Sequence, residues 1–266
     1  MHTIPTEILI RIYGDLPVPD VLHLSATCHR LRQVLDEHTP TIYKRLRRQI
    51  KCERHARAVL ADQGILPLNS PSVTIRHLLQ LQRNFRVVEK AIVVFDREVT
   101  ANIHISNPSF NNKFYGGKPR PLHLTPTERH RFIRSYYQVW SLLLLDRPSR
   151  EHRLRTTLLK DLYLIYEMCD FWEPFDDEMD FPSLDEKRSE LIDQVFDYSR
   201  YLYYHIHEQD YMGISGADVE LQTRGHAAIW DHCQPDFKRI VCWEWCDPDK
   251  KPVREEEVWE NTTDEE

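Results

Sequence analysis

Apolar residues recur at alternating intervals of three and four along the stretch from Ile75 to Val99. That spacing places them on one face of an α-helix. A sustained stripe of this kind occurs both in free coiled coils and in long helices packed in a bundle. Because the stripe covers only about three heptads, we predict one long helix within a bundle, and the free coiled coil is the alternative. The stripe consists of Ile75, Leu78, Leu81, Phe85, Val88, Ile92, Phe95 and Val99.

The same helical period continues towards the C-terminus. Thr125-Pro126-Thr127-Glu128 is a capping box with proline at the first helical position, and Ser183 to Glu186 is a second one. Only seven glycines occur among 266 residues, which argues against a turn-rich β architecture. We therefore predict an all-α fold. A last helix is expected from Asp218 to Cys233. Three further apolar stripes precede it: Phe132, Tyr136, Trp140, Leu143 and Leu144; Leu154, Leu158, Leu162, Ile165, Cys169 and Trp172; and Leu191, Val195, Ser199, Leu202 and Ile206.

Three short helices are predicted ahead of these stripes. Pro5 suits the first turn of a helix, and apolar residues follow it at helical spacing until Gly14 and the Leu16-Pro17-Val18-Pro19 stretch stop the helix. A second helix is expected from Asp20, and a third from Thr27 to Leu35. Helices this short bury little apolar surface by themselves, so a partner protein or the rest of the chain has to cover them.

The order of apolar anchors in this N-terminal segment resembles the F-box, a short three-helix module that docks onto the Skp adaptor of cullin-type ubiquitin ligases. The resemblance covers residues 4 to about 46, with Ile4-Pro5 in place of the usual Leu-Pro and with the Glu7-Ile8-Leu9 triplet intact. Thr27-Cys28-His29-Arg30 is similar to a form common in filamentous-fungal members, and Tyr43 stands where an aromatic residue often closes the box. Some apolar residues of this segment must hold the three helices together, and others are implied by the resemblance to contact the adaptor. The candidates for adaptor contacts are Ile4, Pro5, Ile8, Leu9, Ile12, Leu16, Val21, Leu22 and Leu31.

The resemblance implies a receptor subunit that makes no covalent bonds itself. Such a protein binds the Skp adaptor and, through it, a cullin, and it presents an unidentified protein target with its remaining domain. The alternatives are an adaptor-bound scaffold or regulator that works outside a ligase, and an N-terminal helical corner without a partner. No internal repeat is visible, which excludes leucine-rich or WD-type arrays as the recognition domain.

The expected organisation is an F-box at residues 1–46, an α-helical domain of unknown specificity at 47–246 and an acidic tail at 247–266. Thr39-Pro40 is expected to open a helix that runs towards Leu60. Residues 104–124 form a long irregular segment and are a candidate boundary within the helical domain. The tail holds nine acidic and three basic side chains, which gives it a net charge of −6, whereas the whole chain has a net charge of −7. We expect the tail to be disordered.

Membrane insertion and secretion are not expected. No apolar run approaches the ~20 residues needed to cross a bilayer, since the strongest, Leu142 to Leu145, ends at Asp146. The N-terminus has no basic segment followed by an apolar stretch, so no secretory signal is predicted. Six cysteines are scattered without a disulfide framework, which is typical of a reduced protein of the cytoplasm or the nucleus.

Signals of catalysis, metal binding and nucleic-acid binding are weak. His207-Glu208 begins a zinc-protease motif, but Tyr211 stands where the second histidine is required, and no glycine-rich phosphate loop or Cys-x-x-Cys pair occurs. The basic run from Lys44 to Arg57 is interpreted as the solvated face of a connecting helix rather than a nucleic-acid site. We therefore expect no enzyme, no cofactor and no bound metal, and zinc or nucleic-acid binding is the least favoured alternative. The best metal candidates are His226, His232, Cys233, Cys242 and Cys246.

Overall fold

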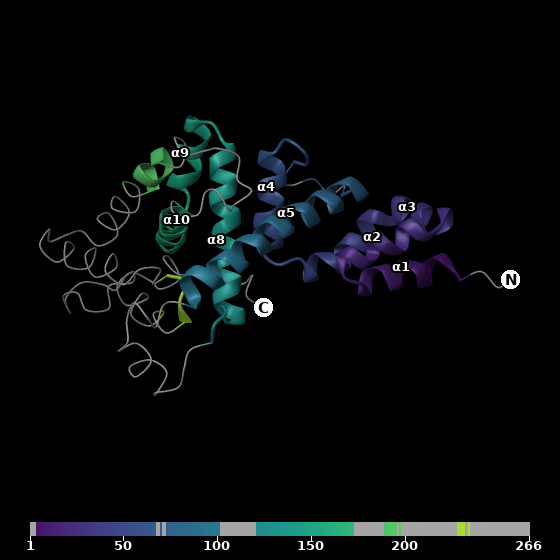
Figure 1. The fold of residues 1–266 in the computed structure, drawn as a ribbon. Coiled ribbons are helices and arrows are strands. Elements are labelled where there is room, and N and C mark those ends of the chain that lie inside the picture. The colour runs from purple at the N-terminus through teal and green to yellow at the C-terminus, as the bar shows by residue number, and fades with distance from the viewer. Residues whose placement is uncertain are drawn as a thin grey trace, which may run out of the picture. The chain divides into compact units, whose positions relative to one another are not determined.

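The computed structural model describes residues 4–67, 70, 73–101, 121–172, 189–195, 197, 228–231 and 234 (Figure 1). All regular secondary structure in these residues is helical, so the predicted all-α fold is confirmed for this part of the chain. The chain divides into two compact units, Met1–Glu89 and Lys90–Glu266. Each unit is described by itself below.

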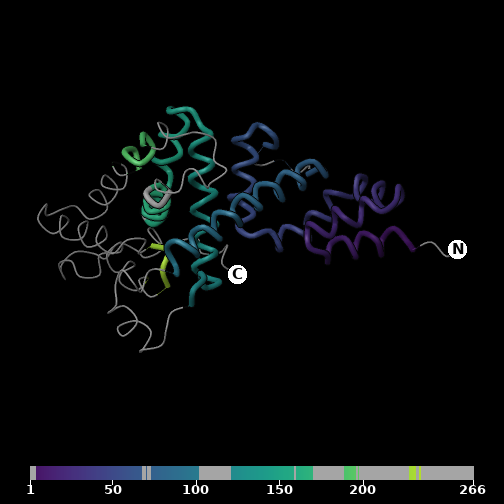
Figure 2. Tube along the Cα trace, viewed as in Figure 1, coloured from purple at the N-terminus to yellow at the C-terminus, as the bar shows by residue number. Residues whose placement is uncertain are grey.

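The first unit begins with the three predicted helices. They are α1 (Thr6–Asp15), α2 (Val18–Thr27) and α3 (His29–Leu46), and both α1 and α2 pack against α3 (Figure 2). α2 starts two residues before the predicted Asp20. The reason is that Pro19 falls in the first helical turn, where a missing N–H leaves no hydrogen bond unmade.

Helices α1 and α3 approach each other closely at Gly14. A Cβ atom at this position would lie 2.4 Å from Cδ of Arg45, and the Nε2 amide of Gln49 donates a hydrogen bond to the Gly14 carbonyl at 3.3 Å. The side chains between the three helices form a continuous apolar core. Its buried members are Leu9, Tyr13, Val18, Val21, Val34, Leu35, Ile42, Tyr43 and Leu46.

The prediction that Thr39-Pro40 opens a new helix is wrong. Pro40 lies inside α3, where it cannot donate the usual hydrogen bond to the carbonyl of Asp36. The helix continues because Ile42 and Leu46 beyond the proline are fully buried. Its side chains therefore gain more from packing than the one missing hydrogen bond costs.

The chain turns after α3 rather than at the proline. A short 3-10 helix, η1 (Arg47–Gln49), leads to Cys52, which has a left-handed backbone with φ of 51° and caps α4 (Glu53–Asp62). A residue with a Cβ atom seldom adopts this conformation. The predicted continuous helix towards Leu60 is therefore interrupted over residues 47–52.

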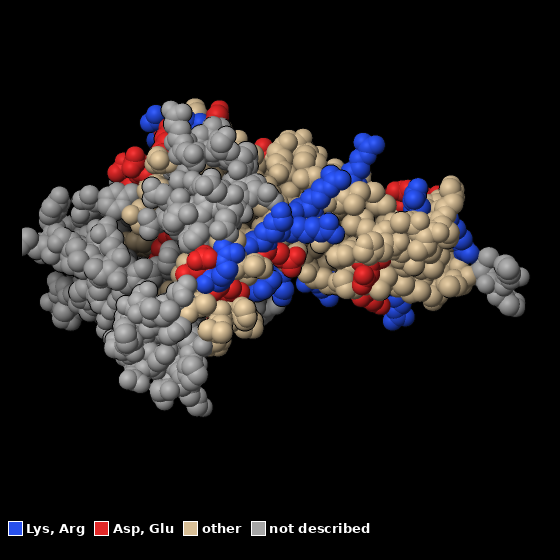
Figure 3. Space-filling model, viewed as in Figure 1, with Lys and Arg blue, Asp and Glu red and all other residues tan. Residues whose placement is uncertain are grey.

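The stripe from Ile75 to Phe95 forms one helix, α5 (Ile75–Phe95), as predicted, and a π-helical turn, η2 (Asp96–Thr100), continues it. Within the first unit the amide of Asn84 donates a hydrogen bond to the side-chain oxygen of Gln63 at 3.2 Å, which ties α5 to the end of α4. Lys and Arg side chains follow α5 as a band on the surface (Figure 3). The buried stripe members are Leu78, Leu81, Val88, Ile92 and Phe95.

The second unit contains α8 (Pro126–Leu144), which begins at the predicted capping box. The backbone N–H of Glu128 donates to Oγ1 of Thr125 at 3.2 Å, and the N–H of Thr125 donates to Oε2 of Glu128 at 3.0 Å. Phe132 on this helix packs against Phe95, with ring centroids 4.9 Å apart. The sequence therefore located the start of α8, but burial extends beyond the predicted stripe to Ile133, Tyr137, Val139 and Leu142.

The stripe predicted from Leu154 to Trp172 is divided between two helices. These are α9 (Arg147–Arg155), capped by the side chain of Asp146, and α10 (Leu159–Trp172). α10 packs against α8, where both carboxylate oxygens of Asp161 accept from Arg134 at 2.7 and 2.8 Å. Residues 156–158 break the helix, and the apolar period alone does not detect such a break.

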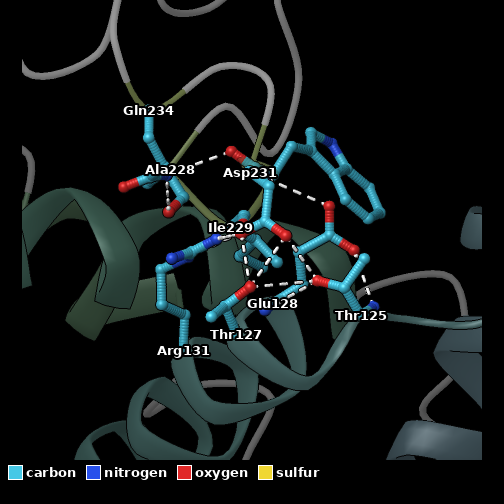
Figure 4. A network of polar contacts seen from close by, with 9 residues as sticks. Thr125, Thr127, Glu128, Arg131, Ala228, Ile229, Asp231 and Gln234 are labelled. Atoms are coloured by element: carbon cyan, nitrogen blue, oxygen red, sulfur yellow. Dashed lines mark hydrogen bonds and ion pairs between the residues drawn. The ribbon is translucent and has the colours of Figure 1, made fainter. Parts of the chain in front are cut away.

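A short segment near the end of the described residues is bound to the start of α8 (Figure 4). The carboxylate of Asp231 accepts hydrogen bonds from the hydroxyls of Thr125 and Thr127 and pairs with Arg131. The N–H of Asp231 in turn donates to Oε1 of Glu128 at 3.1 Å. Residues 228 and 229 lie in a turn, so the helix predicted from Asp218 to Cys233 is wrong there.

Several predictions fall outside the described residues. They are the second capping box at Ser183 to Glu186, the acidic tail at 247–266 and most of the candidate boundary at 104–124. At the end of that boundary segment, the N–H of Leu124 donates to Oδ1 of Asp96 at 2.8 Å, which holds the chain against η2 just before α8 begins.

Candidate functional site

Three exposed isoleucines lie along α1 and just before its first residue. Ile4 is 51% exposed, Ile8 is 46% exposed and Ile12 is 38% exposed. The spacing of four places Ile8 and Ile12 above one another on one face of α1, and Ile4 lies two residues before the helix begins. Single exposed apolar residues are common, but two β-branched side chains on one face of a short helix, with a third just before it, offer an apolar surface that a partner can cover. We call Ile4, Ile8 and Ile12 the isoleucine ladder.

The structure separates the nine adaptor-contact candidates into different environments. Leu9 is 5% exposed and Val21 is fully buried, so both belong to the core that joins α1 and α2 to α3. Pro5 is exposed next to the ladder. The remaining candidates are half-buried, and these are Leu16, Leu22 and Leu31.

The core behind the ladder holds a buried tyrosine. Tyr13 is fully buried on α1, and its hydroxyl donates a hydrogen bond to the carbonyl of Leu31 on α3 at 2.9 Å. Burial raises the pKa of Tyr13 to about 12, and the charge of a Cys28 thiolate adds to the effect. Arg30 donates to the carbonyl of Ile4, which holds the first residue of the ladder close to the start of α3. These two contacts fix the orientation of α1 on α3.

The far end of the module is joined to α4 by side chains that the sequence did not single out as a group. The hydroxyl of Tyr43 donates to a carboxylate oxygen of Glu53, which also lies 3.8 Å from Arg57. Arg57 donates to the carbonyl of Ser70 at 2.7 Å. The aromatic residue at the end of the box was the only signal for this joint. The partner of Tyr43 is Glu53, which follows a turn, and helical periodicity does not predict turns.

No arrangement suited to metal binding occurs in the part of the chain that the structure describes, where no cluster of three or more His, Cys, Asp or Glu side chains is present. The five metal candidates between His226 and Cys246 lie outside the described residues. Lys44, Arg48 and Arg54 of the basic run are exposed, but the run covers the end of α3, a turn and α4 instead of one helix face. What the first unit offers is an apolar contact surface.

None of the described helices combines the length and the apolar character needed to cross a bilayer.

Glutamate, arginine and aspartate side chains flank the ladder at Glu7, Arg11 and Asp15, and all three are exposed. The α1 surface is thus an apolar row with polar edges, which is the usual composition of a protein contact region.

The N-terminal part of the chain is similar to a known family. No curated protein and no solved structure matches the chain. A family comparison matches residues 1–49 to the F-box-like family, which includes the three helices, the isoleucine ladder and η1. The match extends three residues beyond the end expected from the sequence. Residues 1–49 of this chain form an F-box-like domain.

Proposed function

We propose that this protein is the substrate-receptor subunit of a Skp–cullin–F-box ubiquitin ligase and that the isoleucine ladder on α1 is the centre of its adaptor contact. The observation that carries the proposal is the exposure of Ile4, Ile8 and Ile12 on a domain of the F-box-like family. Members of this family are typically non-catalytic. The chain would then act by positioning a target close to a ubiquitin-loaded enzyme, which raises the effective concentration of the target lysine.

The division between exposed and buried candidates supports a specific contact set. Full burial of an isoleucine side chain is worth about 1.5–3 kcal/mol, and side chains that are half-exposed beforehand gain roughly half of that. Three such residues therefore contribute a few kcal/mol to binding. Leu16, Leu22 and Leu31 are half-buried and remain candidates for the contact, whereas Leu9 and Val21 are buried in the core.

The proposal is tested with Ile8→Asp and Ile12→Asp in the full chain, each co-expressed with the Skp adaptor. A carboxylate buried in an apolar contact costs about 2–4 kcal/mol, a loss of roughly 30- to 1,000-fold in affinity. We expect a stoichiometric complex for the wild type and none for either variant. Ile65→Asp is the matched control, because Ile65 is also an isoleucine in the first unit and is 40% exposed.

The far-ultraviolet circular dichroism spectrum shows whether each variant keeps its helices. A folded Ile8→Asp variant that still binds the adaptor with unchanged affinity would contradict the proposal. Equal loss of binding in the Ile65→Asp control would show that the effect is not specific to the ladder.

The role in a ligase is tested separately from adaptor binding. We expect the adaptor complex to recover a cullin and to occur in the cytoplasm or the nucleus. A complex that contains the adaptor but never a cullin would support the alternative of a scaffold or regulator outside a ligase. The target is expected to be recruited by residues 47–246, and no residue is assigned to that contact.

A further inference from the structure

One face of α5 within the first unit carries three exposed arginines. Arg76, Arg83 and Arg86 are separated by seven and three residues, which aligns them along the helix. Leu79 lies between the first two arginines and is 37% exposed. Figure 3 shows Lys and Arg side chains in a band along α5. We call Arg76, Leu79, Arg83 and Arg86 the basic face of α5.

Contacts away from the basic face fix the rotation of α5 in the first unit. Leu78 and Leu81 are buried, and Asn84 is only 2% exposed. The Asn84 side chain accepts a hydrogen bond from the amide of Gln80 at 2.9 Å and donates one to the side-chain oxygen of Gln63 at 3.2 Å. Because the helix is packed and hydrogen-bonded through these residues, it cannot turn its arginines towards the core of the first unit.

The positive charge of the basic face is not compensated in the part of the chain that the structure describes. No hydrogen bond or ion pair joins Arg76, Arg83 or Arg86 to another described residue, and the sequence has no Asp or Glu from residue 75 to residue 88. The first unit holds thirteen Lys or Arg and eight Asp or Glu, a net charge of +5, in a chain whose net charge is −7. Such a face attracts a ligand of negative charge.

We propose that the basic face of α5 is a docking surface for an acidic segment of the protein target. This inference rests on the proposed function, because it assigns part of the target contact to α5. A guanidinium group pairs with a carboxylate through two parallel hydrogen bonds, so arginines suit carboxylate side chains. Carboxylates of the segment would pair with Arg76, Arg83 and Arg86, and an apolar side chain between them would contact Leu79.

The spacing of the arginines sets the length of the segment. Arg76 and Arg86 are ten positions apart on α5, which corresponds to about 15 Å along the helix axis. An extended chain rises about 3.3 Å per residue, so about five residues cover this distance. A segment of that length with acidic residues on both sides of an apolar residue therefore matches the basic face in charge and in length.

Two other assignments fit the observations less well. A nucleic-acid strand would find no aromatic side chain on the basic face on which a base can stack. The basic run from Lys44 to Arg57 is a weaker site for an acidic segment, because Glu53 lies within the run and its carboxylate is 3.8 Å from Arg57. That run also covers the end of α3, a turn and α4, whereas the basic face belongs to one helix.

The affinity of the basic face is tested with the purified full chain, without the adaptor, and the fluorescein-labelled peptide EELEE. Fluorescence anisotropy at low ionic strength should detect binding, which should be absent for the uncharged peptide QQLQQ. Arg83→Glu/Arg86→Glu should weaken binding of EELEE about tenfold, because two attractive pairs become repulsive. Circular dichroism shows whether the variant keeps its helices.

Arg48→Glu/Arg54→Glu is the matched control for this titration. Both arginines are exposed in the first unit, and neither has a partner among the described residues. The control makes the same change in net charge, so it should change the affinity for EELEE by less than about twofold. Equal weakening in the two double variants would overturn the proposal, because the peptide would then respond only to the overall charge.

A crosslinking measurement locates the bound peptide. Arg83→Lys/Arg86→Lys keeps the charge of the basic face and supplies amines, which a carbodiimide joins to carboxylates of EELEE as amides. We expect mass spectrometry to find the peptide attached at position 83 or 86 more often than at position 48 or 54 of the control Arg48→Lys/Arg54→Lys. Attachment at equal frequency would overturn the proposal. Displacement of EELEE by an oligothymidylate that binds about tenfold more tightly would assign the face to nucleic acid instead.

The same proteins separate this inference from the proposed function. Arg83→Glu/Arg86→Glu should still form the adaptor complex, since neither residue lies in the F-box-like domain of residues 1–49. A wild-type chain that binds EELEE but no adaptor would contradict the proposed function alone. A chain that binds the adaptor but not EELEE would overturn the docking surface alone.

Discussion

The hydroxyl of Tyr43 on α3 donates a hydrogen bond to the carboxylate of Glu53 on α4, across the turn formed by residues 47–52. Burial raises the pKa of Tyr43, and the hydrogen bond and the charge of Glu53 raise it further, so the hydroxyl stays protonated. The last aromatic residue of the F-box-like domain is thereby joined to the first residue of the helix that follows. This contact holds the domain to the rest of the first unit.

We predict that Tyr43→Phe lowers the free energy of unfolding by about 1–2 kcal/mol, since the carboxylate of Glu53 loses a hydrogen bond in a partly buried place. Urea denaturation followed by circular dichroism measures the change. A double-mutant cycle with Glu53→Ala isolates the pair, because alanine has no side-chain acceptor for the Tyr43 hydroxyl. Strictly additive effects of the two substitutions would show that the two side chains do not interact.

Leu9 and Ile8 are neighbours in sequence with opposite roles. Leu9→Asp places a charge in the core between α1 and α3, and we expect it to destabilise the domain by more than about 3 kcal/mol. Ile8→Asp changes a side chain that is 46% exposed, so it should cost less than about 1 kcal/mol of stability. Thermal unfolding of both variants tests this difference. Similar melting temperatures would mean that Leu9 is not a core residue.

His77 makes the start of α5 sensitive to pH. The N–H of Thr74 donates to Nδ1 of His77 at 3.0 Å, and a protonated ring cannot accept this bond. Burial lowers the pKa of His77, and the charge of Arg57 lowers it further. The unfolded chain therefore binds a proton more readily, so this residue's contribution to stability is present above about pH 6.5 and is lost as the pH falls through the lowered folded-state pKa.

The variant His77→Gln separates this effect from the other histidines. Glutamine at the third helical position can accept from the N–H of Thr74 without titrating. We expect a smaller loss of stability in this variant than in the wild type when the pH is lowered from about 7 to about 5. Urea denaturation at the two pH values gives the comparison, and identical pH dependence in both proteins would contradict it.

Asp231 holds its segment to the N-terminal end of α8. Burial raises the pKa of Asp231, but hydrogen bonds from Thr125 and Thr127 and the pairing with Arg131 outweigh this and lower it overall. Asp231→Asn removes the charge beside Arg131 and should cost about 1–2 kcal/mol of stability at neutral pH. Because the folded-state pKa is depressed, the carboxylate's contribution is present above about pH 3.9 and is lost as the pH falls through the lower folded value.

The readout for this prediction is the difference in unfolding free energy between the wild type and Asp231→Asn, measured at neutral and at acidic pH. The difference should shrink in acid, where the wild-type carboxylate is also neutral. Thr127→Ala is a useful companion, because it removes one hydrogen-bond donor to Asp231 and leaves the Arg131 pair in place. A difference that is constant with pH would show that the charge of Asp231 is not the stabilising feature.

Local chemistry accounts for the features that the sequence predicted correctly. The capping box at Thr125 and Glu128 requires only residues three apart, and the long helix α5 requires only a repeated apolar period. The order of anchors from Ile4 to Leu31 was enough to predict an F-box-like domain, because the three short helices are each defined by nearby residues and prolines.

Two helix boundaries differ from those predicted from the sequence. Pro40 was expected to begin a helix, yet the burial of Ile42 and Leu46 keeps α3 intact through it. The break at residues 156–158 divides a stripe whose apolar spacing is unbroken. At Pro40, burial of the residues beyond it outweighs the unfavourable local propensity, and at residues 156–158 the apolar period does not register the break.

By itself the sequence determined the helical class, the capping box of α8 and the N-terminal domain, since each depends on residues within a few positions of one another. Only the tertiary structure decided which adaptor candidates are accessible. Ile8 and Ile12 on α1 and Ile4 just before it remain exposed, while Leu9 and Val21 are buried in the core of the three helices. The reason is geometric, because the side of a helix that is covered depends on the neighbour it packs against, and that neighbour lies far along the chain.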